Sequence, residues 1–303
     1  MKKVLGMFLS LAMILTFGNI STFAEEAAGS DIVRAKQQLA RIHSDEFIAN
    51  FKDTAEYVQR NERIVKLVCK MQAGVLDPNA ACSELESMGI YKLETVDPEQ
   101  NTTIVPASEP ANIKMNDVTT LYDSYTGRWL VGGGGYWQDD SAWLDDVPLN
   151  FFPTVGQSLN VGGYDGVGVK LYNTSGTYNT RLIESYAYYT AGDPTEYYNY
   201  NPSISDGSKG AYFQFQDRAI VTATTGFYSS YKYVGRNFSV MLVYDSNFSN
   251  FSGYARTQYT HTWSNAQISQ VSFGANGTSP TFEVTIQNAN NSFNIYSSGE
   301  TRF

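Results

Sequence analysis

The spacing of apolar residues divides the chain into two regions. Between residues 47 and 68, apolar side chains recur every three, four or seven positions, which places them on one stripe of a helix. Ser44 is a suitable N-cap for this helix, and Gly74 is suited to end it. Asn79 can cap a shorter second helix, and the segment 30–42 also has a helical pattern. The first region is therefore predicted to be a small helical unit.

Beyond residue 117 the period of the pattern changes to two. In 211–216 ("AYFQFQ") and 281–286 ("TFEVTI") apolar and polar side chains alternate, as in strands with one buried face. The run 238–244 ("FSVMLVY") is more uniformly apolar, which predicts a central strand. Turn sequences separate such segments at Asp165-Gly166, Asp206-Gly207 and Asn276-Gly277. The chain is predicted to be mainly β, with a large antiparallel β-sandwich or barrel preceded by a small N-terminal α-helical unit.

Composition supports this division. All four tryptophans lie beyond residue 117, together with most of the tyrosines and glycines. The first residues combine two lysines, an apolar core and a small-x-small pattern ending at Ala24, which predicts a secretory signal peptide rather than a membrane anchor. The expected organisation is a signal peptide at 1–24, a helical unit at 25–96, a Pro-containing linker at 97–117 and an antiparallel β domain at 118–303.

Charge and cysteine content limit the partners and the compartment. The net charge of −9 over 303 residues argues against nucleic acid as a partner. A signal peptide predicts a secreted, extracellular protein, in which an even number of cysteines indicates a disulfide. Cys69 lies on the edge of the predicted helical stripe, and Cys82 lies in the first turn of the next helix. We expect a Cys69–Cys82 bridge, and the alternative is two buried free thiols.

The stretch 131–147, "VGGGGYWQDDSAWLDDV", combines a glycine run with aromatic and acidic residues. The glycines are interpreted as a bulge or bend in a strand rather than a phosphate cradle, which requires a following helix and a different spacing. The acidic residues are hard oxygen ligands, so a calcium loop is one reading. Their spacing is not that of an EF-hand, and solvated turn residues are the other reading; no other cofactor is predicted. The residues concerned are Asp139, Asp140, Asp145 and Asp146.

Aromatic residues of the same stretch are candidates for stacking on sugars. Tyr136, Trp137 and Trp143 can form such a platform, or they can belong to the core as large aromatic residues usually do. Strand alternation also places His261 and Trp263 on one face. That face is either an aromatic ligand surface or a core-facing strand with a hydrogen-bonded histidine. The chain has two histidines, which excludes a His-rich zinc site, and it has no G-x-S-x-G elbow.

Glu184 is the candidate carboxylate in an aromatic setting. In "RLIESYAYY" it shares a strand face with Tyr186 and Tyr188, and an apolar surround would raise its pKa toward that of a general acid. A glycosidase needs a second carboxylate, for which Glu283 and Asp165 are available. The alternative is a cross-strand salt bridge.

The C-terminal segment from Gln258 onward resembles the corresponding part of secreted β-rich proteins of Gram-positive bacteria. The resemblance rests on "Y-x-H-T-W", at Tyr259 to Trp263, followed by a strand that ends in "VSFG". It implies secretion and a β fold but no activity. We expect a non-enzymatic binding protein for neutral polysaccharide or cell wall. The alternatives are a membrane-active, pore-forming-like β protein with a helical pro-segment, and a carboxylate-based glycoside hydrolase.

Overall fold

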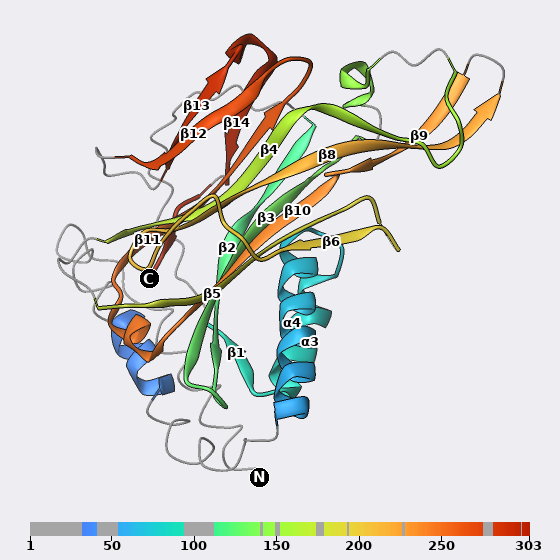
Figure 1. The fold of residues 1–303 in the computed structure, drawn as a ribbon. Coiled ribbons are helices and arrows are strands. Elements are labelled where there is room, and N and C mark those ends of the chain that lie inside the picture. The colour runs from blue at the N-terminus through green and yellow to red at the C-terminus, as the bar shows by residue number, and fades with distance from the viewer. Residues whose placement is uncertain are drawn as a thin grey trace, which may run out of the picture.

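In the described part of the chain, two large antiparallel sheets, a separate two-stranded hairpin and an N-terminal helical unit make up the fold, which confirms the predicted mainly β fold class (Figure 1). The structure is a computed structural model that describes residues 32–40, 54–93, 112–139, 142–148, 152–173, 179–192, 194–225, 228–274, 281–297 and 299–303. The predicted signal peptide lies outside the described residues.

The helical unit begins with residues 32–40, inside the segment with the predicted helical pattern. Helix α3 (Thr54–Gln72) buries Val65 and Val68 of the predicted apolar stripe but leaves Val58 51% exposed, and helix α4 (Pro78–Ser87) follows it. Asp77, not Asn79, caps α4, because its carboxylate accepts a hydrogen bond of 2.9 Å from Ala80 N. Pro78 then occupies the first turn, where a missing N–H costs nothing. The predicted N-cap Ser44 lies outside the described residues.

The first sheet has six strands in the order β1-β2-β3-β10-β5-β6. These strands are β1 (Ile90–Lys92), β2 (Ile113–Asp123), β3 (Arg128–Trp137), β10 (Asn237–Tyr244), β5 (Leu182–Thr190) and β6 (Glu196–Asn199). The predicted linker therefore overlaps β2 from Ile113 onward, and residues 94–111 lie outside the described part of the chain.

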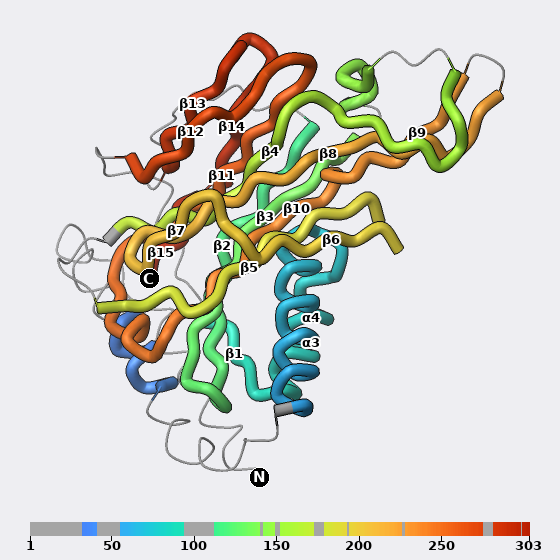
Figure 2. The backbone as a smooth tube through the Cα atoms, in the orientation of Figure 1, coloured from blue at the N-terminus to red at the C-terminus, as the bar shows by residue number. Residues whose placement is uncertain are grey.

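The second sheet has the order β14-β11-β4-β8-β7, with β15 beside β11 and β9 beside β8. Its strands are β4 (Ser158–Asn173), β7 (Ile204–Asp206), β8 (Gly210–Thr225), β9 (Tyr228–Val234), β11 (Gly253–Thr262), β14 (Ser292–Tyr296) and β15 (Thr301–Arg302). A separate hairpin pairs β12 (Gln267–Phe273) with β13 (Phe282–Gln287). Figure 2 shows β4 and β8 running across β3 and β10, and buried residues of all four strands form one core between the sheets.

Strand β10 is buried on both faces, which explains its uniformly apolar sequence. Phe238, Val240 and Leu242 point into the core between the sheets. Met241 and Val243 point the other way, into a second core under α3. The prediction of a central strand at 238–244 is confirmed, because β10 pairs with β3 on one side and with β5 on the other.

The glycine run of β3 lets neighbouring layers approach the sheet closely. A Cβ on Gly132 would lie 3.1 Å from Val68 Cγ1 of α3, and a Cβ on Gly133 would lie 2.1 Å from Thr257 Oγ1 of β11. The interpretation of the run as a bulge or bend is confirmed in part: β3 pairs with β10 without a register shift, but its pairing with β2 is irregular opposite Gly132 and Gly134. The irregularity lies in the neighbouring strand β2, between Asn116 and Thr119.

Two further local predictions fail for packing reasons. Asp165-Gly166 is not a turn but lies inside β4, where a Cβ on Gly166 would come within 2.1 Å of Tyr212 Oη. The expected buried face of β13 is only partly buried, because β13 pairs with β12 alone. Asp206-Gly207 does form the turn between β7 and β8, and Asn276-Gly277 lies outside the described residues.

Ion pairs hold α3 against the first sheet. Arg60 Nη1 and Nη2 donate to the two carboxylate oxygens of Asp123 at 2.9 and 2.7 Å, and both side chains are nearly buried. Near the other end of the helix, Lys70 Nζ lies 2.5 Å from Glu196 Oε1 of β6. Together with the shared core, these pairs fix α3 to β2 on one side and to β6 on the other.

Residues 32–40 attach to the far end of the sandwich through a buried lysine. Lys36 Nζ donates to Phe251 O and lies 5.3 to 5.8 Å from the ring centroids of Phe248, Phe251 and Phe303. Burial lowers the pKa of Lys36 to about 7. The three rings and the carbonyl replace the water that the ammonium group loses.

The hairpin of β8 and β9 extends past the rest of the second sheet (Figure 1). The pairing of β4 with β8 ends at Ser158 and Ile220, whereas the pairing of β8 with β9 continues to Thr225 and Tyr228. Among the described helices, none combines the length and the apolar character needed to cross a bilayer.

Candidate functional site

The two tryptophans considered as a sugar platform lie in the core. Trp137 and Trp143 are each only 2% exposed. Trp137 packs edge-on against His261 with 5.1 Å between ring centroids, and Trp143 stacks on Tyr233 at 4.6 Å. Protein side chains therefore occupy the faces that a sugar would need, and the core reading of these residues is the one the structure shows.

The other aromatic candidates are half-buried and cover neighbouring groups. Tyr136 lies over Gly74 at the end of α3, where a Cβ would be 2.4 Å from its ring. Trp263 stacks on His261 with 5.6 Å between the centroids and 23° between the planes. Trp263 and Trp137 thus both pack against the imidazole, and the face that Trp263 turns to His261 is occupied by protein.

His261 is the centre of a fully buried charged cluster between the sheets. Its Nδ1 lies 3.0 Å from both carboxylate oxygens of Asp165, which comes from β4. Asp217 of β8 lies 4.0 Å from the same nitrogen. On the other side of the ring, Nε2 lies 3.4 Å from Asp146 Oδ2, in the short helix η1 (Leu144–Asp146). The histidine therefore lies among three carboxyl groups.

Electrostatics favours a protonated histidine in this cluster. Burial by itself lowers the pKa of His261, but Asp165 first, and then Asp146 and Asp217, raise it to about 10. The pKa of Asp217 is raised well above its usual range by burial and by the charge of Asp165. The favoured arrangement is an imidazolium between Asp165 and Asp146, with a proton retained on Asp217.

Asp165, Asp217 and His261 are also the one group of three metal-ligating side chains among the described residues, with their ligand atoms within 4.8 Å of one another. The cluster is satisfied without an ion, because the hydroxyls of Tyr259 and Tyr233 donate to Asp165 and Asp217 at 2.5 and 2.6 Å. The imidazolium supplies the positive charge that buried carboxylates require. We therefore assign this cluster a structural role.

The calcium loop is not assembled by the acidic residues that suggested it. Asp139 and Asp145 are exposed, and Asp146 is engaged by His261. These three do not gather into a group of ligands in the described part of the chain, and Asp140 lies outside it. The observed arrangement of the three fits the reading as turn residues better than the calcium reading.

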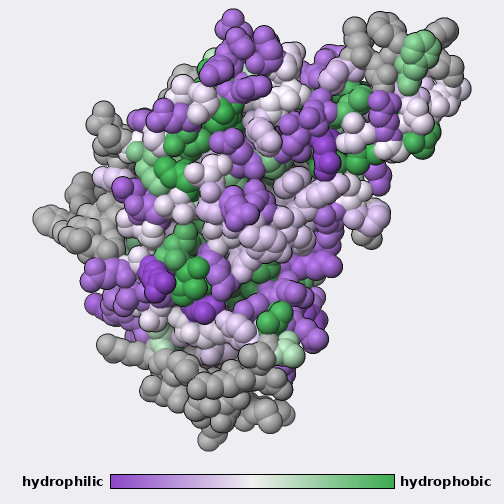
Figure 3. Space-filling model, viewed as in Figure 1, coloured by the Kyte–Doolittle hydropathy of each residue, from purple (hydrophilic) through white to green (hydrophobic). Residues whose placement is uncertain are grey.

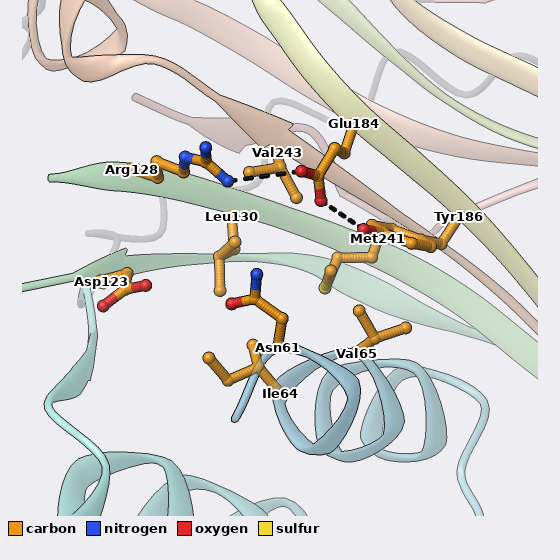
Figure 4. Close-up of a pocket in the computed structure, with 10 residues that line it drawn as sticks. All are labelled: Asn61, Ile64, Val65, Asp123, Arg128, Leu130, Glu184, Tyr186, Met241 and Val243. Carbon is orange, nitrogen blue, oxygen red and sulfur yellow. Dashed lines mark hydrogen bonds and ion pairs between the residues drawn. The ribbon is translucent and has the colours of Figure 1, made fainter. Parts of the chain in front are cut away.

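An accessible group of polar side chains lies on the opposite face of the first sheet, between β5 and α3 (Figure 4). Glu184 of β5 accepts from Arg128 Nη1 at 3.4 Å and from the hydroxyl of Tyr186. Burial raises the pKa of the Tyr186 phenol, and the hydrogen bond and charge of Glu184 raise it further. The predicted sharing of a strand face by Glu184 and Tyr186 is seen in the structure.

Two hollows meet at Glu184 and Tyr186, and we call them together the Glu184 groove. The first, of about 20 Å³, lies between α3 and the sheet. The second, of about 330 Å³, lies over β5 and is open to solvent. Its wall includes Tyr200, which is 61% exposed and packs edge-on against Tyr186 at 5.4 Å. The other lining residues of the second hollow are Leu182, Ile183, Ser185 and Ser205.

The predicted disulfide is not formed, since Cys69 and Cys82 are both free cysteines. Cys69 is buried on the side of α3 that faces β10, where Ser239 Oγ donates to its carbonyl at 2.9 Å. Cys82 Sγ lies 3.8 Å from Met71 Sδ instead. The helix therefore turns Cys69 toward the sheet rather than toward α4, and burial raises the pKa of its thiol to about 12.

A comparison of the chain with known protein families gave no match, and a comparison with curated proteins gave none either.

Two residues of the Glu184 groove carry no signal in the sequence. Arg128 is 56 positions from Glu184, and the two meet only because β3 and β5 flank the same strand, β10. Tyr200 follows β6 in a tyrosine-rich segment where any of several rings is a candidate. Arg128 and Tyr200 can be identified as groove residues only when the order of strands in the sheet is known.

Proposed function

We propose that the protein binds neutral polysaccharide, and that the Glu184 groove is its binding site. The observation that carries this proposal is the exposed ring of Tyr200 beside the Arg128–Glu184 pair, over an open hollow of about 330 Å³. An aromatic ring presents area to the C–H face of a sugar, and a few fixed polar groups orient its hydroxyls. Ser185 and Ser205 add hydroxyls to the same wall.

The charges of the groove favour a neutral ligand. Arg128 is paired with Glu184, and Asp123, which lines the first hollow, is paired with Arg60. No unbalanced charge from these four side chains remains to attract an anionic or cationic chain. The paired groups still offer hydrogen-bond donors and acceptors, since Arg128 and Glu184 are 28% and 37% exposed.

The same geometry favours binding over hydrolysis. A glycosidase needs two carboxyl groups facing one sugar, roughly 5 to 10 Å apart. Of the partners considered for Glu184, Asp165 is sealed in the His261 cluster and Glu283 lies in the separate β12–β13 hairpin. Asp123 is held by two hydrogen bonds from Arg60. Glu184 is therefore proposed as a hydrogen-bonding residue and not as a general acid.

The proposal is tested by sedimentation of the protein with insoluble cellulose, chitin and peptidoglycan. At least one matrix is expected to retain the wild-type protein. Tyr200→Ala should weaken retention about tenfold, which corresponds to about 1.4 kcal/mol. Glu184→Gln should weaken it as well, because the amide cannot keep the ion pair with Arg128.

Tyr164→Ala is the matched control, because Tyr164 is a similarly exposed tyrosine, 54% against 61%, and does not line either hollow of the groove. Its retention should equal that of the wild type. Absence of retention on every matrix rejects polysaccharide binding. Equal losses for Tyr164→Ala and Tyr200→Ala would place the binding site elsewhere and reject the groove.

A further inference from the structure

The projecting end of the second sheet exposes large apolar side chains. Phe152 is 89% exposed and Tyr228 is 83% exposed, the two highest values among the exposed large hydrophobic residues of the described chain. Val155 is 59% exposed. Figure 3 shows apolar side chains gathered on this end of the molecule, at the upper right of the view. Side chains of this kind are expected to be covered by a partner when they cluster.

Backbone pairing brings these residues to one place. Gly156 N donates to Val221 O at 2.8 Å, so the segment before β4 runs alongside β8 in the antiparallel direction. The chain turns over 154–157, where Gln157 N donates to Thr154 O at 2.9 Å, and Figure 2 shows the segment before β4 beside the end of the β8–β9 hairpin, where Thr225 pairs with Tyr228. Both rings therefore lie at the same end, which we call the tip and define as Phe152, Val155 and Tyr228.

The tip lies in parts of the sequence that have no acidic residue. The segments 148–164 and 218–244, which contain the tip and the strands leading to it, have no Asp or Glu, although the protein carries a net charge of −9. Their charged residues are Arg218, Lys232 and Arg236. Lys232 is exposed on β9 and is paired in register with Ile220. The tip therefore has no acidic side chain of its own for a surface of phosphate groups to repel.

We propose that the tip is a contact surface for a lipid bilayer, in which the rings of Phe152 and Tyr228 enter the headgroup region. Aromatic side chains favour this region because their apolar bodies and polar edges suit its gradient of polarity. A protein partner fits the tip less well. A stable protein interface covers about 800 Å² on each side, whereas a large aromatic side chain buries only about 150–250 Å². A fluid bilayer needs no such complementary area.

A fluorescent label at the tip tests the proposal directly. Val155→Cys and Val58→Cys, each in a Cys82→Ser background, are labelled with an environment-sensitive nitrobenzoxadiazole dye. The two valines are a matched pair, 59% and 51% exposed, and Val58 lies on α3. Addition of phosphatidylcholine vesicles should raise the emission at position 155 severalfold and shift it to the blue, with no change at position 58. No response at 155, or equal responses at both positions, overturns the proposal.

Flotation with the same vesicles measures the contribution of the rings. The double variant Phe152→Ser/Tyr228→Ser should lower the bound fraction on the order of a hundredfold, at about tenfold for each ring withdrawn from the bilayer. Tyr164→Ser removes an exposed tyrosine from a part of β4 that lies away from the tip, and it should bind as the wild type does. Unchanged flotation of the double variant contradicts the assignment of the tip. The free energy of unfolding in urea serves as an independent check that the variants are folded.

Discussion

The His261 cluster and the Glu184 groove lie on opposite faces of the first sheet. They contain the same types of side chain but differ in their proposed roles. In the His261 cluster, Asp165 is fully buried and meets a tyrosine hydroxyl, an imidazole and a backbone N–H. In the Glu184 groove, Glu184 meets an arginine and a tyrosine hydroxyl but keeps contact with solvent. Residue type does not distinguish the two carboxylates. Burial does, because only the exposed one can exchange a partner for a ligand.

The largest expected effect is on stability, at Asp165. Asp165→Ala leaves the imidazolium of His261 and the hydroxyl of Tyr259 buried without their main partner. Removal of one member of a buried charge pair costs on the order of 3–5 kcal/mol. Urea unfolding should therefore show a large loss of free energy for this variant.

The matching change in the groove, Glu184→Ala, should cost at most about 1 kcal/mol, since solvent replaces part of what Arg128 loses. The comparison breaks down if the two variants lose similar amounts of unfolding free energy. It is sharpened if Asp165→Ala, examined at a temperature where it stays folded, matches the wild type in the sedimentation assay of the proposed polysaccharide binding.

The pH dependence of stability should reveal the same cluster. The pKa of His261 is raised to about 10, against about 6.5 in an unfolded chain. The folded state therefore holds this proton more tightly, so its stabilising contribution is complete below about pH 6.5 and is lost as pH rises toward 10. Asp217, whose pKa is also raised, contributes with the same sign.

Lys36 opposes this trend and must be removed from the measurement. Its pKa is lowered to about 7, so the unfolded chain takes up the proton more readily, and stability from this group rises with pH above 7. In a Lys36→Met background, the unfolding free energy should fall steadily between pH 6 and 8, below the range in which unfolded cysteines ionise near 8.5 and unfolded tyrosines near 10. A flat or rising profile in this variant contradicts a protonated His261.

Sequence patterns predicted the parts of this molecule that repeat a local rule. The burial of Val65 and Val68 on α3 and the two-sided burial of β10 follow from period and apolar content, whereas Val58 of the same predicted stripe is exposed. The reading of His261 as a hydrogen-bonded residue on a core-facing strand also follows from alternation. Such features can be predicted because they depend only on residues that are close in the sequence.

The partners across the sheets could not be predicted, because the fold alone brings them together. The sequence Asp165-Gly166 is typical of a turn. In the structure, Gly166 instead leaves space for the side chain of Tyr212, and the carboxylate of Asp165 points into the core toward His261. Trp137 and Trp143 looked suitable for a sugar platform until their neighbours His261 and Tyr233 were placed against them. Whether an aromatic residue is exposed in a binding site or buried in the core depends on how the sheets pack together. Local sequence patterns contain no information on that packing.

The smallest expected effect is the coupling between Arg128 and Glu184. Their closest atoms lie 3.4 Å apart and both side chains are partly exposed, so the pair gains little over hydration. A double-mutant cycle with Arg128→Ala and Glu184→Ala should give a coupling free energy of about 0.2–1 kcal/mol in urea unfolding. The equivalent cycle with His261→Ala and Asp165→Ala should give a clearly larger value, because no water reaches the buried pair to replace a lost partner. If the coupling free energy in the groove equals that in the core, burial does not distinguish the two sites. Glu184 would then be a structural residue whose hydrogen bonds are all used within the protein, so that it could not bind a ligand.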